Sequence, residues 1–597
     1  MRLPLPLVRR ATLLLALAAP PAAAQRAAAP PPSAALQALL DAHWRWTLRE
    51  SPLLATTLGE RAYDRELGDL TTAAMDRRAR EAAAFLARLD ALDTARLAPA
   101  ERVTRAILRR DLAETVEGNR FGQRTVLFTT YSGWHTGFAN LPDNHPFRER
   151  ADYDAYVARL ARFPAYNRGA LATTRAALAG GFAQPCAPFA KYEGTISGAV
   201  AGAPERSRFL EPFARRPAYV SEREWGDLRA RAVALVRDSV YPAYGELLAF
   251  YRSDYAPRCR ATAAVSATPG GAAYYAFRVR SETSTDLTPE QVHQLGLREV
   301  ARIGAEMDAV AARAGHPSRR AFVARLRSDP RYYARTPAEL LAAASVLAKR
   351  IDGEMPTYFG RLPRLPYTIK PVPEAEAPVT TTAYYDGGSL EGGRPGVYRV
   401  NTSKLDQRPL YELPALTMHE AVPGHHHQIA LAQELDLPPF RRYKVAFAAF
   451  SEGWGLYAER LGTEMGLYST PETEMGRLSY EMWRATRLVV DAGIHAKGWT
   501  RDQAIAYMAE HTALSRANIE AEVNRYITWP GQATAYKVGE LRIRELRARA
   551  ERRLGDRFDL RAFHDAVLEN GPVPLSVLEA EVERWIVRAE RAPAAAK

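Results

Sequence analysis

The chain has 597 residues, of which 47% are hydrophobic and 25% are charged, so it can bury a large core and does not have the composition of a disordered protein. Its formal net charge is +13, but most basic residues are arginines dispersed along segments of helical pattern, and no nucleic-acid-binding motif occurs. This distribution is typical of a solvated surface and argues against a nucleic-acid partner.

The N-terminus has the pattern of a cleaved signal peptide. Arg2, Arg9 and Arg10 are followed by an apolar run over 11–19 and by three alanines, 22–24, that form a small-residue cleavage site. The apolar run is too short for a permanent membrane helix, and no cysteine follows the cleavage point for lipid attachment. We therefore expect 1–24 to be a signal peptide of a periplasmic or secreted protein with no stable membrane insertion. Its removal takes away three arginines and no acid, so the net charge falls from +13 to +10. The alternative is a disordered Ala-rich tail.

Helical patterns dominate the rest of the chain, after an Ala/Pro-rich segment over 25–34 that we expect to be disordered. Amphipathic periodicity covers about 35–50, 73–116, 151–180, 222–253 and 574–591. Helix-capping residues at Thr288, Thr336 and Thr500 precede further helical runs to about 314, over 340–351 and over 504–510. Between 366 and 401, tyrosine, threonine and valine alternate with Gly-rich turns, which predicts two or three short strands. We therefore predict a mainly α fold, with 35–597 as one helical domain and a small β element near 366–401.

Cys186 and Cys259 are the only cysteines, and both lie near prolines in apparent loops. In an oxidising compartment they could form a disulfide, but the sequence gives no distance between them and leaves the pairing open.

A histidine-rich segment, Thr-Met-His-Glu-Ala-Val-Pro-Gly-His-His-His-Gln at 417–428, contains the side chains of a zinc site. In an ordinary His-Glu-x-x-His helix the two histidines are four residues apart and share one face. Here Pro423 occupies that fourth position after His419, and the next histidines are His425 and His426. On a straight helix neither could share a zinc ion with His419. Pro423 cannot donate to the carbonyl of His419, and Gly424 can adopt unusual backbone angles, so we predict a break that swings His425 toward His419. The alternative is a surface cluster of histidines at a helix break.

Two carboxylates follow about 25 residues later. Glu452 and Glu459 are seven residues apart in Ser-Glu-Gly-Trp-Gly-Leu-Tyr-Ala-Glu, so they share one face of a helix. We predict Glu452 as a metal ligand and Glu459 as a residue that orients a histidine ligand. A plain surface carboxylate is the alternative for Glu459.

The chain resembles the bacterial family catalogued as domain of unknown function 885. Four motifs carry the resemblance over about 36–590: H-E-x-x-P-G-H-H at 419–426, S-E-G-W-x-L-Y-x-E at 451–459, D-x-G-x-H-x-x-G-W at 491–499 and R-Y-x-x-W-P-G-Q-A-x-x-Y-K at 525–537. The resemblance implies a helical fold like that of zinc peptidases.

The arrangement is also similar to helical gluzincin peptidases such as carboxypeptidase Taq and angiotensin-converting enzyme. In those a His-Glu-x-Gly-His helix is followed by a glutamate on the next helix. This similarity implies that His419, His425 and Glu452 hold one zinc ion and that Glu420 is the general base. A two-residue insertion leaves His426 as the alternative ligand to His425.

Hydrolysis at zinc also requires a donor for the developing oxyanion, and substrate binding requires polar partners. Tyr536, after the turn-forming Trp-Pro-Gly-Gln, is our first candidate for that donor, and His495 and Tyr526 are others. Three basic residues could bind a substrate carboxylate: Arg525, Lys537 and Arg394. For each of these residues, packing within the core or a solvated surface is the alternative.

The sequence thus predicts an exported zinc-dependent hydrolase, most simply a metallopeptidase that cleaves short peptides. The alternatives are a catalytically weak metal- or peptide-binding protein of the same fold and a hydrolase of non-peptide amides. Glu420 favours catalysis, because a pure binder needs no carboxylate beside the first ligand. The sequence does not indicate the substrate, the peptide end attacked, the native metal or the oligomeric state.

Overall fold

The computed structural model describes 33–592 except for 131, 375–376, 378–380 and 391–392. The predicted signal peptide, 1–24, lies outside the described residues, as does most of the segment over 25–34. The last two residues of that segment are ordered, because Ser33 accepts a hydrogen bond from Leu36 N and caps a helix that begins at Ala34. Among the described residues, no helix is both long and apolar enough to cross a membrane.

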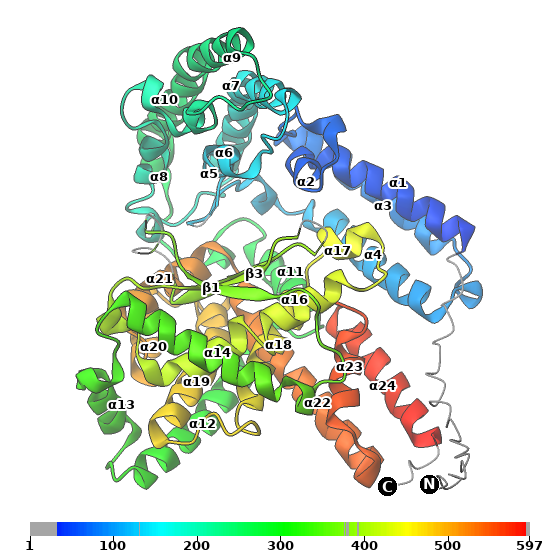
Figure 1. Ribbon diagram of the computed structural model, residues 1–597, viewed down its shortest axis with the longest axis vertical. Helices are drawn as coiled ribbons and strands as arrows, with labels where there is room; N and C mark the ends of the chain where they lie inside the picture. Colours follow the sequence, from blue (N-terminus) through cyan, green and yellow to red (C-terminus); the bar gives the residue numbers. More distant parts are fainter. Residues whose placement is uncertain (1–32, 131, 375–376, 378–380, 391–392, 593–597) are drawn as a thin grey trace, which may run out of the picture.

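The helices form three groups in different parts of the molecule (Figure 1). The first group runs along one side and comprises α1 (Ala34–Glu50), α2 (Pro52–Thr57), α3 (Thr72–Asp90) and α4 (Pro99–Gly118). The second group gathers at the top of the view and comprises α5 (Trp134–Ala139), α6 (Leu141–Asn144), α7 (Arg150–Ala179), α8 (Glu193–Ser197), α9 (Glu222–Leu235) and α10 (Tyr241–Phe250).

The third group is the largest and forms the lower body of the molecule in Figure 1. It comprises α11 (Gly271–Thr283), α12 (Pro289–Arg313), α13 (Arg319–Ser328), α14 (Pro337–Tyr358), α15 (Leu413–Glu420), α16 (His425–Gln433), α17 (Pro439–Tyr443), α18 (Ala448–Leu461), α19 (Pro471–Lys497), α20 (Arg501–His511), α21 (Arg516–Thr528), α22 (Ala535–Leu554), α23 (Leu560–Leu568) and α24 (Leu575–Arg591). The mainly α prediction is confirmed.

Buried apolar side chains join the first and third groups. Leu36 and Ile107 of the first group belong to the same core as Phe450 and Trp454 of α18 and Val538 of α22. The second group packs around a separate core of its own, rich in aromatic side chains such as Tyr156 and Phe163. The N-terminal helices therefore support the two helices, α18 and α22, that carry candidate site residues.

The predicted helix starts are confirmed. The hydroxyls of Thr288, Thr336 and Thr500 accept hydrogen bonds from backbone N–H groups three residues later, at 3.2, 3.1 and 3.2 Å. One predicted boundary is wrong: the pattern over 73–116 is two helices, α3 and α4, because Pro99 begins a new helix at its first position. The run over 222–253 is continuous but includes two π-helical turns, Val236–Val240 and Tyr251–Tyr255.

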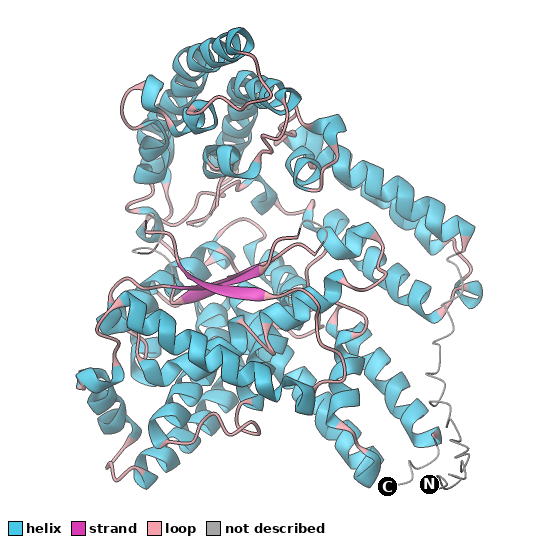
Figure 2. Ribbon diagram, viewed as in Figure 1, coloured by secondary structure: helices cyan, strands magenta, loops and turns pink. Residues whose placement is uncertain are grey.

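A small sheet accompanies the helices, as predicted for 366–401 (Figure 2). Its strands are β1 (Tyr367–Pro371), β2 (Ala383–Asp386) and β3 (Gly396–Val400), in the order β1-β3-β2. β1 is parallel to β3 and β2 is antiparallel to it, with Ile369 and Tyr385 on either side of Tyr398. The hydroxyl of Tyr398 lies 3.4 Å from that of Thr417 in α15, so the sheet packs against the helix that precedes the histidines.

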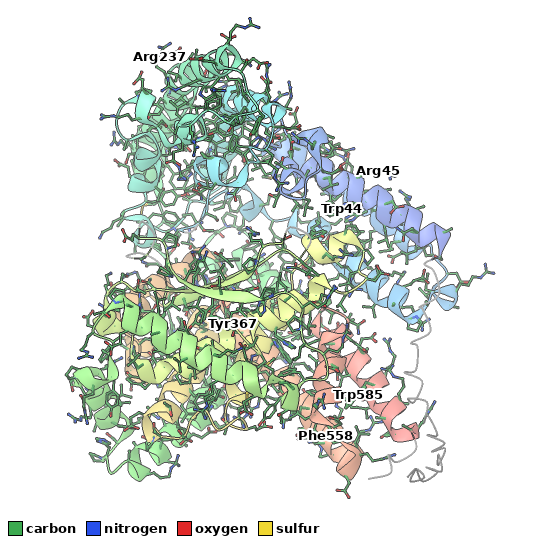
Figure 3. All side chains as sticks on the ribbon, viewed as in Figure 1. Trp44, Arg45, Arg237, Tyr367, Phe558 and Trp585 are labelled. Atoms are coloured by element: carbon green, nitrogen blue, oxygen red, sulfur yellow. A yellow bond between two sulfur atoms is a disulfide. The ribbon has the colours of Figure 1, made fainter. Side chains whose placement is uncertain are left out.

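The structure answers two further questions raised by the sequence: whether the two cysteines pair, and where the arginines lie. Cys186 and Cys259 form a disulfide between the loop after α7 and the segment after α10. Many arginines lie on the surface in ion pairs, as expected, although others, such as Arg159 and Arg484, are buried. Arg237, labelled at the upper end of the molecule in Figure 3, pairs with Asp238 at 2.6 Å, and both side chains are more than half exposed.

Candidate metal centre

The helix that contains His419 breaks where the sequence predicts. α15 ends at Glu420 and α16 begins at His425, with Ala421–Gly424 between them. A Cβ atom at Gly424 would lie 2.0 Å from the carbonyl oxygen of His419, so only glycine fits this close turn. Trp454 of α18 donates from its indole Nε1 to the carbonyl oxygen of Pro423 at 2.7 Å. The break is therefore built into the packing of three helices.

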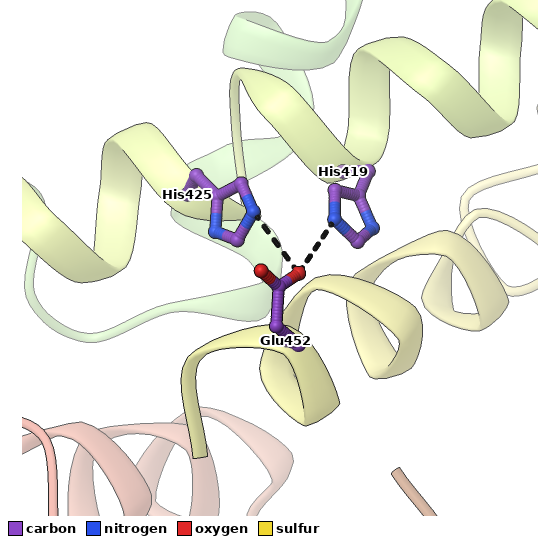
Figure 4. Close-up of side chains that lie close together, drawn as sticks. All are labelled: His419, His425 and Glu452. Carbon is purple, nitrogen blue, oxygen red and sulfur yellow. Dashed lines mark ion pairs between the residues drawn. The ribbon is translucent and has the colours of Figure 1, made fainter. Parts of the chain in front are cut away.

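His419, His425 and Glu452 converge across this break (Figure 4). Glu452 Oε2 lies 3.4 Å from His419 Nε2 and 3.5 Å from His425 Nε2, and the three ligand atoms are all within 4.8 Å of one another. Two ligands at about 2.0–2.2 Å from a tetrahedral ion lie roughly 3.3–3.5 Å apart. The two histidine–carboxylate separations therefore fit a zinc ion, and the predicted convergence of His419 and His425 is confirmed.

A second carboxylate lies behind His419. Glu459 Oε1 accepts a hydrogen bond from His419 Nδ1 at 2.8 Å and forms an ion pair with Arg484 Nη2 of α19 at 3.0 Å. Only 3% of the Glu459 side chain is exposed, so it is not a surface carboxylate. This contact fixes the ring of His419 and directs Nε2 toward Glu452, which is the arrangement that tunes histidine ligands in metalloproteins.

The electrostatics of the group favour a cation. Burial opposes the protonation of His419, but the carboxylates of Glu452 and Glu459 outweigh it and raise the pKa of the ring to about 9. Burial alone would raise the pKa of Glu452, yet His425 and His419 hold it well below its usual range. The two carboxylates thus stabilise positive charge at His419 in a largely buried site, where 14% of the His425 side chain and 21% of the Glu452 side chain remain exposed.

Glycines on α18 create the room for His419. A Cβ atom at Gly455 would lie 2.5 Å from Cε1 and 2.8 Å from Nδ1 of His419. A Cβ atom at Gly453 would lie 2.5 Å from the backbone of Gly539 in α22. The Gly-Trp-Gly sequence after Glu452 therefore lets α18 approach the histidine on one side and α22 on the other.

The structure separates His425 from the histidines that follow it. The ring of His426 faces the sheet, where Nδ1 lies 2.9 Å from the Tyr385 hydroxyl and the ring packs on Tyr367. Burial lowers the pKa of His426 to about 4. His426 therefore neither joins the ligand group nor orients a ligand, which corrects that alternative. His427 is fully buried beside Phe359, so the three histidines are not a surface cluster.

Glu420 and Tyr536 flank the ligands. Glu420 is the last residue of α15, directly after His419, and is 8% exposed. Tyr536 lies in the first turn of α22 and is partly exposed. Burial and the negative charge of Glu452 both raise the pKa of the Tyr536 phenol, which therefore stays protonated near neutral pH and can donate a hydrogen bond. The roles of base for Glu420 and oxyanion donor for Tyr536 stay predictions.

Three predicted site residues have structural roles instead. His495 is fully buried, with Nδ1 accepting from Val265 N at 3.1 Å and Nε2 bonded to the Tyr526 carbonyl at 2.9 Å. Lys537 is also fully buried, in ion pairs with glutamates 299, 481 and 540. The hydroxyl of Tyr526 is buried and donates to Glu522 at 2.8 Å. None of the three has a group left to contact substrate, so these predictions are wrong.

The remaining two basic candidates lie in different settings. Arg525 of α21 is partly buried and bonds to Glu522 Oε2 at 3.1 Å and to Gln532 Oε1 at 2.8 Å. Arg394 is exposed on the turn between β2 and β3, where its Nη2 lies 3.4 Å from the Gly387 carbonyl. Only Arg525 belongs to a buried polar cluster.

Comparison with known proteins agrees with the motifs. The family of bacterial proteins of unknown function DUF885 matches residues 52–582. The chain belongs to the DUF885 family. A similar fold is seen in a crystal structure from Colwellia psychrerythraea, described as a candidate lipoprotein, with 28% identity and a TM-score of 0.86 over 93% of this chain and 99% of that one. A candidate lipoprotein of unknown function from Shewanella oneidensis has 18% identity and a TM-score of 0.72 over 91% and 99% of the two chains. No curated protein matches this DUF885 chain.

Sequence reasoning missed the arginines of α19 in this DUF885 protein. Arg484 holds Glu459, and Arg487, one turn later, packs against Tyr536. A signal was present in the sequence: the helix is almost entirely buried, yet charged residues recur at helical spacing, at 477, 481, 484, 487 and 491. Charges in such a segment must have buried partners.

A cavity of about 750 Å³ lies away from the metal centre of the DUF885 fold. Its walls come from α1–α4 and from α11, with Trp46 and Phe277 among the lining residues. None of the three ligand residues lines it, so its size gives no support to the metal centre.

Proposed function

We propose that this protein is an exported zinc-dependent hydrolase, specifically a metallopeptidase that cleaves short peptides. The observation that supports the proposal best is the convergence of His419, His425 and Glu452 at tetrahedral separations of 3.4 and 3.5 Å. Two imidazoles and one carboxylate are the protein ligands of many hydrolytic zinc sites, which keep a fourth position for water. Glu459 and Arg484 support the site from behind.

In this proposal His419, His425 and Glu452 hold the metal. A bound zinc ion would acidify water and polarise the scissile carbonyl group. Glu420 takes one proton from the attacking water as its oxygen bonds to the carbonyl carbon. The Tyr536 hydroxyl donates a hydrogen bond to the carbonyl oxygen as negative charge develops there. Glu420 then delivers its proton to the amide nitrogen, the C–N bond breaks, and a carboxylate and an amine are released.

The test is the substitution Glu420→Gln, which keeps the shape of the side chain and removes the base. Hydrolysis of a mixed short-peptide library should fall at least about 100-fold. Zinc content, measured on the same sample, should stay near one ion per chain. Glu434→Gln, at the residue that directly follows α16, is the matched control and should retain activity. Unchanged turnover in Glu420→Gln would refute the proposed base.

The proposal also includes export. If 1–24 is a signal peptide, the mature protein isolated after expression in a bacterium should begin at Gln25 and lie outside the cytoplasm. A cytoplasmic protein that retains Met1 would contradict this part of the proposal.

A further inference from the structure

Tyr536 lies close to the metal ligand Glu452. A Cβ atom at Gly453 of α18 would lie 2.5 Å from the backbone of Gly539 in α22, so the two helices touch at this point. Glu452 directly precedes Gly453, and Tyr536 lies one turn before Gly539. Burial raises the pKa of the Tyr536 phenol, and the nearby carboxylate of Glu452 raises it further. Both side chains therefore belong to the same part of the molecule.

The position of the Tyr536 hydroxyl depends on the packing of its ring. Among the described residues, none forms a hydrogen bond with this hydroxyl. The side chain is partly exposed, so the hydroxyl is available to a substrate. Because no hydrogen bond of its own holds the hydroxyl, it can act as a positioned donor only if other contacts fix the ring.

A guanidinium group lies against the Tyr536 ring. The Cζ atom of Arg487, in α19, is 4.1 Å from the centre of the ring, which is within the range of a cation–π contact. The Arg487 side chain is only 4% exposed. The guanidinium group therefore supports the ring from the interior of the protein and is itself almost inaccessible.

Arg487 is held in place by residues other than Tyr536. Its Nε atom donates to the Tyr526 hydroxyl at 2.9 Å, and its Nη2 atom donates to Glu522 Oε2 at 3.0 Å. The Tyr526 hydroxyl donates to the same Glu522 oxygen at 2.8 Å and accepts from the indole Nε1 of Trp483 at 3.2 Å. The Cζ atom of Arg487 also lies 4.5 Å from the centre of a Trp483 ring. Because these contacts fix the guanidinium group on their own, Arg487 positions Tyr536 rather than the reverse.

We propose that Arg487 is a positioning residue that holds the Tyr536 ring, so that the Tyr536 hydroxyl is directed at the oxyanion of the reaction. The inference rests on the proposed function and adds a residue that acts on the reaction through another side chain. An oxyanion donor contributes only when it lies about 2.7–3.1 Å from the oxyanion, so a small rotation of the ring would remove its contribution. Arginine suits this role because its planar group can stack on a ring while its edge donates hydrogen bonds. The single ammonium group of lysine cannot do both in the same geometry.

The test is a double-mutant cycle with Arg487→Lys and Tyr536→Phe, each alone and combined, in zinc-loaded protein. Arg487→Lys keeps a positive charge beside Glu522, and Tyr536→Phe removes only the hydroxyl. Both kcat and KM are measured for one short peptide that the wild type cleaves. Tyr536→Phe should lower kcat by about 100-fold, as for the loss of one oxyanion donor. Arg487→Lys should lower kcat by at least about 10-fold and change KM by less than about 2-fold, because the affected hydrogen bond forms only in the transition state.

The combined variant separates positioning from a general structural role. If Arg487 acts through the Tyr536 hydroxyl, Arg487→Lys should change kcat by less than about 2-fold once that hydroxyl is absent. The matched control is Arg477→Lys, at another buried arginine of α19, which pairs with Glu481 at 2.8 Å and lies 5.8 Å from the ring of Tyr468. It should leave kcat and KM unchanged. An unchanged kcat in Arg487→Lys, a change in KM alone, or losses that multiply in the combined variant would each overturn the inference.

A milder variant tests the same contact in case Arg487→Lys does not fold. Tyr526→Phe removes only the hydroxyl that accepts from Nε of Arg487. It should lower kcat in the same direction, again only while the Tyr536 hydroxyl is present. An equal loss of kcat in the Tyr536→Phe background would show that Tyr526 and Arg487 act by another route.

Crystal structures of the wild type and of Arg487→Lys separate this inference from the proposed function, because they do not depend on turnover. In Arg487→Lys the Tyr536 ring should leave its observed position or take two orientations, while Glu452 keeps its place. A Tyr536 ring that stays ordered and unmoved overturns the inference, even if the wild type is an active hydrolase. A wild-type protein that cleaves no peptide contradicts the proposed function, and a displaced ring in Arg487→Lys would then still support the hold of Arg487 on Tyr536.

Discussion

The substitution Gly455→Ala tests how closely the helices are fitted around the metal centre. The new methyl carbon would lie 2.5 Å from Cε1 of His419, and an ordinary contact requires about 3.5 Å. The ring, or the turn of α18 beside it, must therefore move by about 1 Å. Metal–ligand distances tolerate about 0.2 Å, so a displacement of this size cannot be absorbed at the metal.

The expected effects on stability and on metal affinity differ. Alanine in a helix gains about 1 kcal/mol over glycine, while overpacking of a core costs about 1–3 kcal/mol, so the free energy of unfolding should fall by at most about 2 kcal/mol. Zinc affinity should fall by about 10- to 100-fold, as for the loss of a contact that orients a ligand.

The assay is zinc competition against a chromophoric chelator, combined with urea unfolding of the metal-free protein. Gly353→Ala is the matched control, because a Cβ atom at this helical glycine of α14 meets nothing within 4 Å. It should leave zinc affinity unchanged and increase stability slightly. Zinc affinity in Gly455→Ala equal to that of the wild type would refute the reasoning, since it would mean that His419 need not occupy its observed position.

Three further predictions concern single substitutions at Glu459, Gly424 and Glu412. Glu459→Gln should lower zinc affinity by about 10- to 100-fold without unfolding the protein, as measured by the same chelator competition. Unchanged zinc affinity would show that the 2.8 Å contact between Glu459 and His419 does not support metal binding. Gly424→Ala should abolish zinc binding, because its methyl group would lie 2.0 Å from the His419 carbonyl, and full zinc occupancy would contradict the fitted turn. Burial raises the pKa of Glu412 from 4.5 to about 8, so the folded protein keeps a proton that the unfolded chain releases. The stability that the folded protein gains by keeping this proton is fully present below about pH 4.5. It is lost as the pH rises toward 8, by up to about 1.4 kcal/mol per pH unit. In urea unfolding, the free energy of unfolding of Glu412→Gln should therefore rise relative to that of the wild type between pH 5 and 8. A difference between the two proteins that does not change with pH would contradict the raised pKa of Glu412.

Local patterns in the sequence were enough to predict much of the fold and the ligand group. The capping residues Thr288, Thr336 and Thr500 act within their own helices, so their hydrogen bonds depend on no distant residue. The break at Pro423 and Gly424 follows from backbone chemistry in the same way, and it decides that His425 turns toward His419.

The roles of single polar residues could not be predicted because they depend on partners far along the chain. Lys537 and Arg525 lie in one motif, but Lys537 is enclosed by glutamates from α12, α19 and α22, while Arg525 shares Glu522 with Arg487. His495 has the motif position of a catalytic histidine, but the backbone of Val265 occupies one of its ring nitrogens and that of Tyr526 the other. No spacing rule within a motif contains this information.

The identity of the second histidine ligand tests the central claim most directly. Zinc stoichiometry and affinity are measured by elemental analysis and chelator competition for the wild type, His425→Ala and His426→Ala. We predict one zinc ion per wild-type chain, loss of tight binding in His425→Ala, and retention of binding in His426→Ala, whose ring contacts Tyr385 rather than Glu452. A wild-type protein without zinc affinity, or zinc binding that survives in His425→Ala and is lost in His426→Ala, would contradict the proposed metal centre.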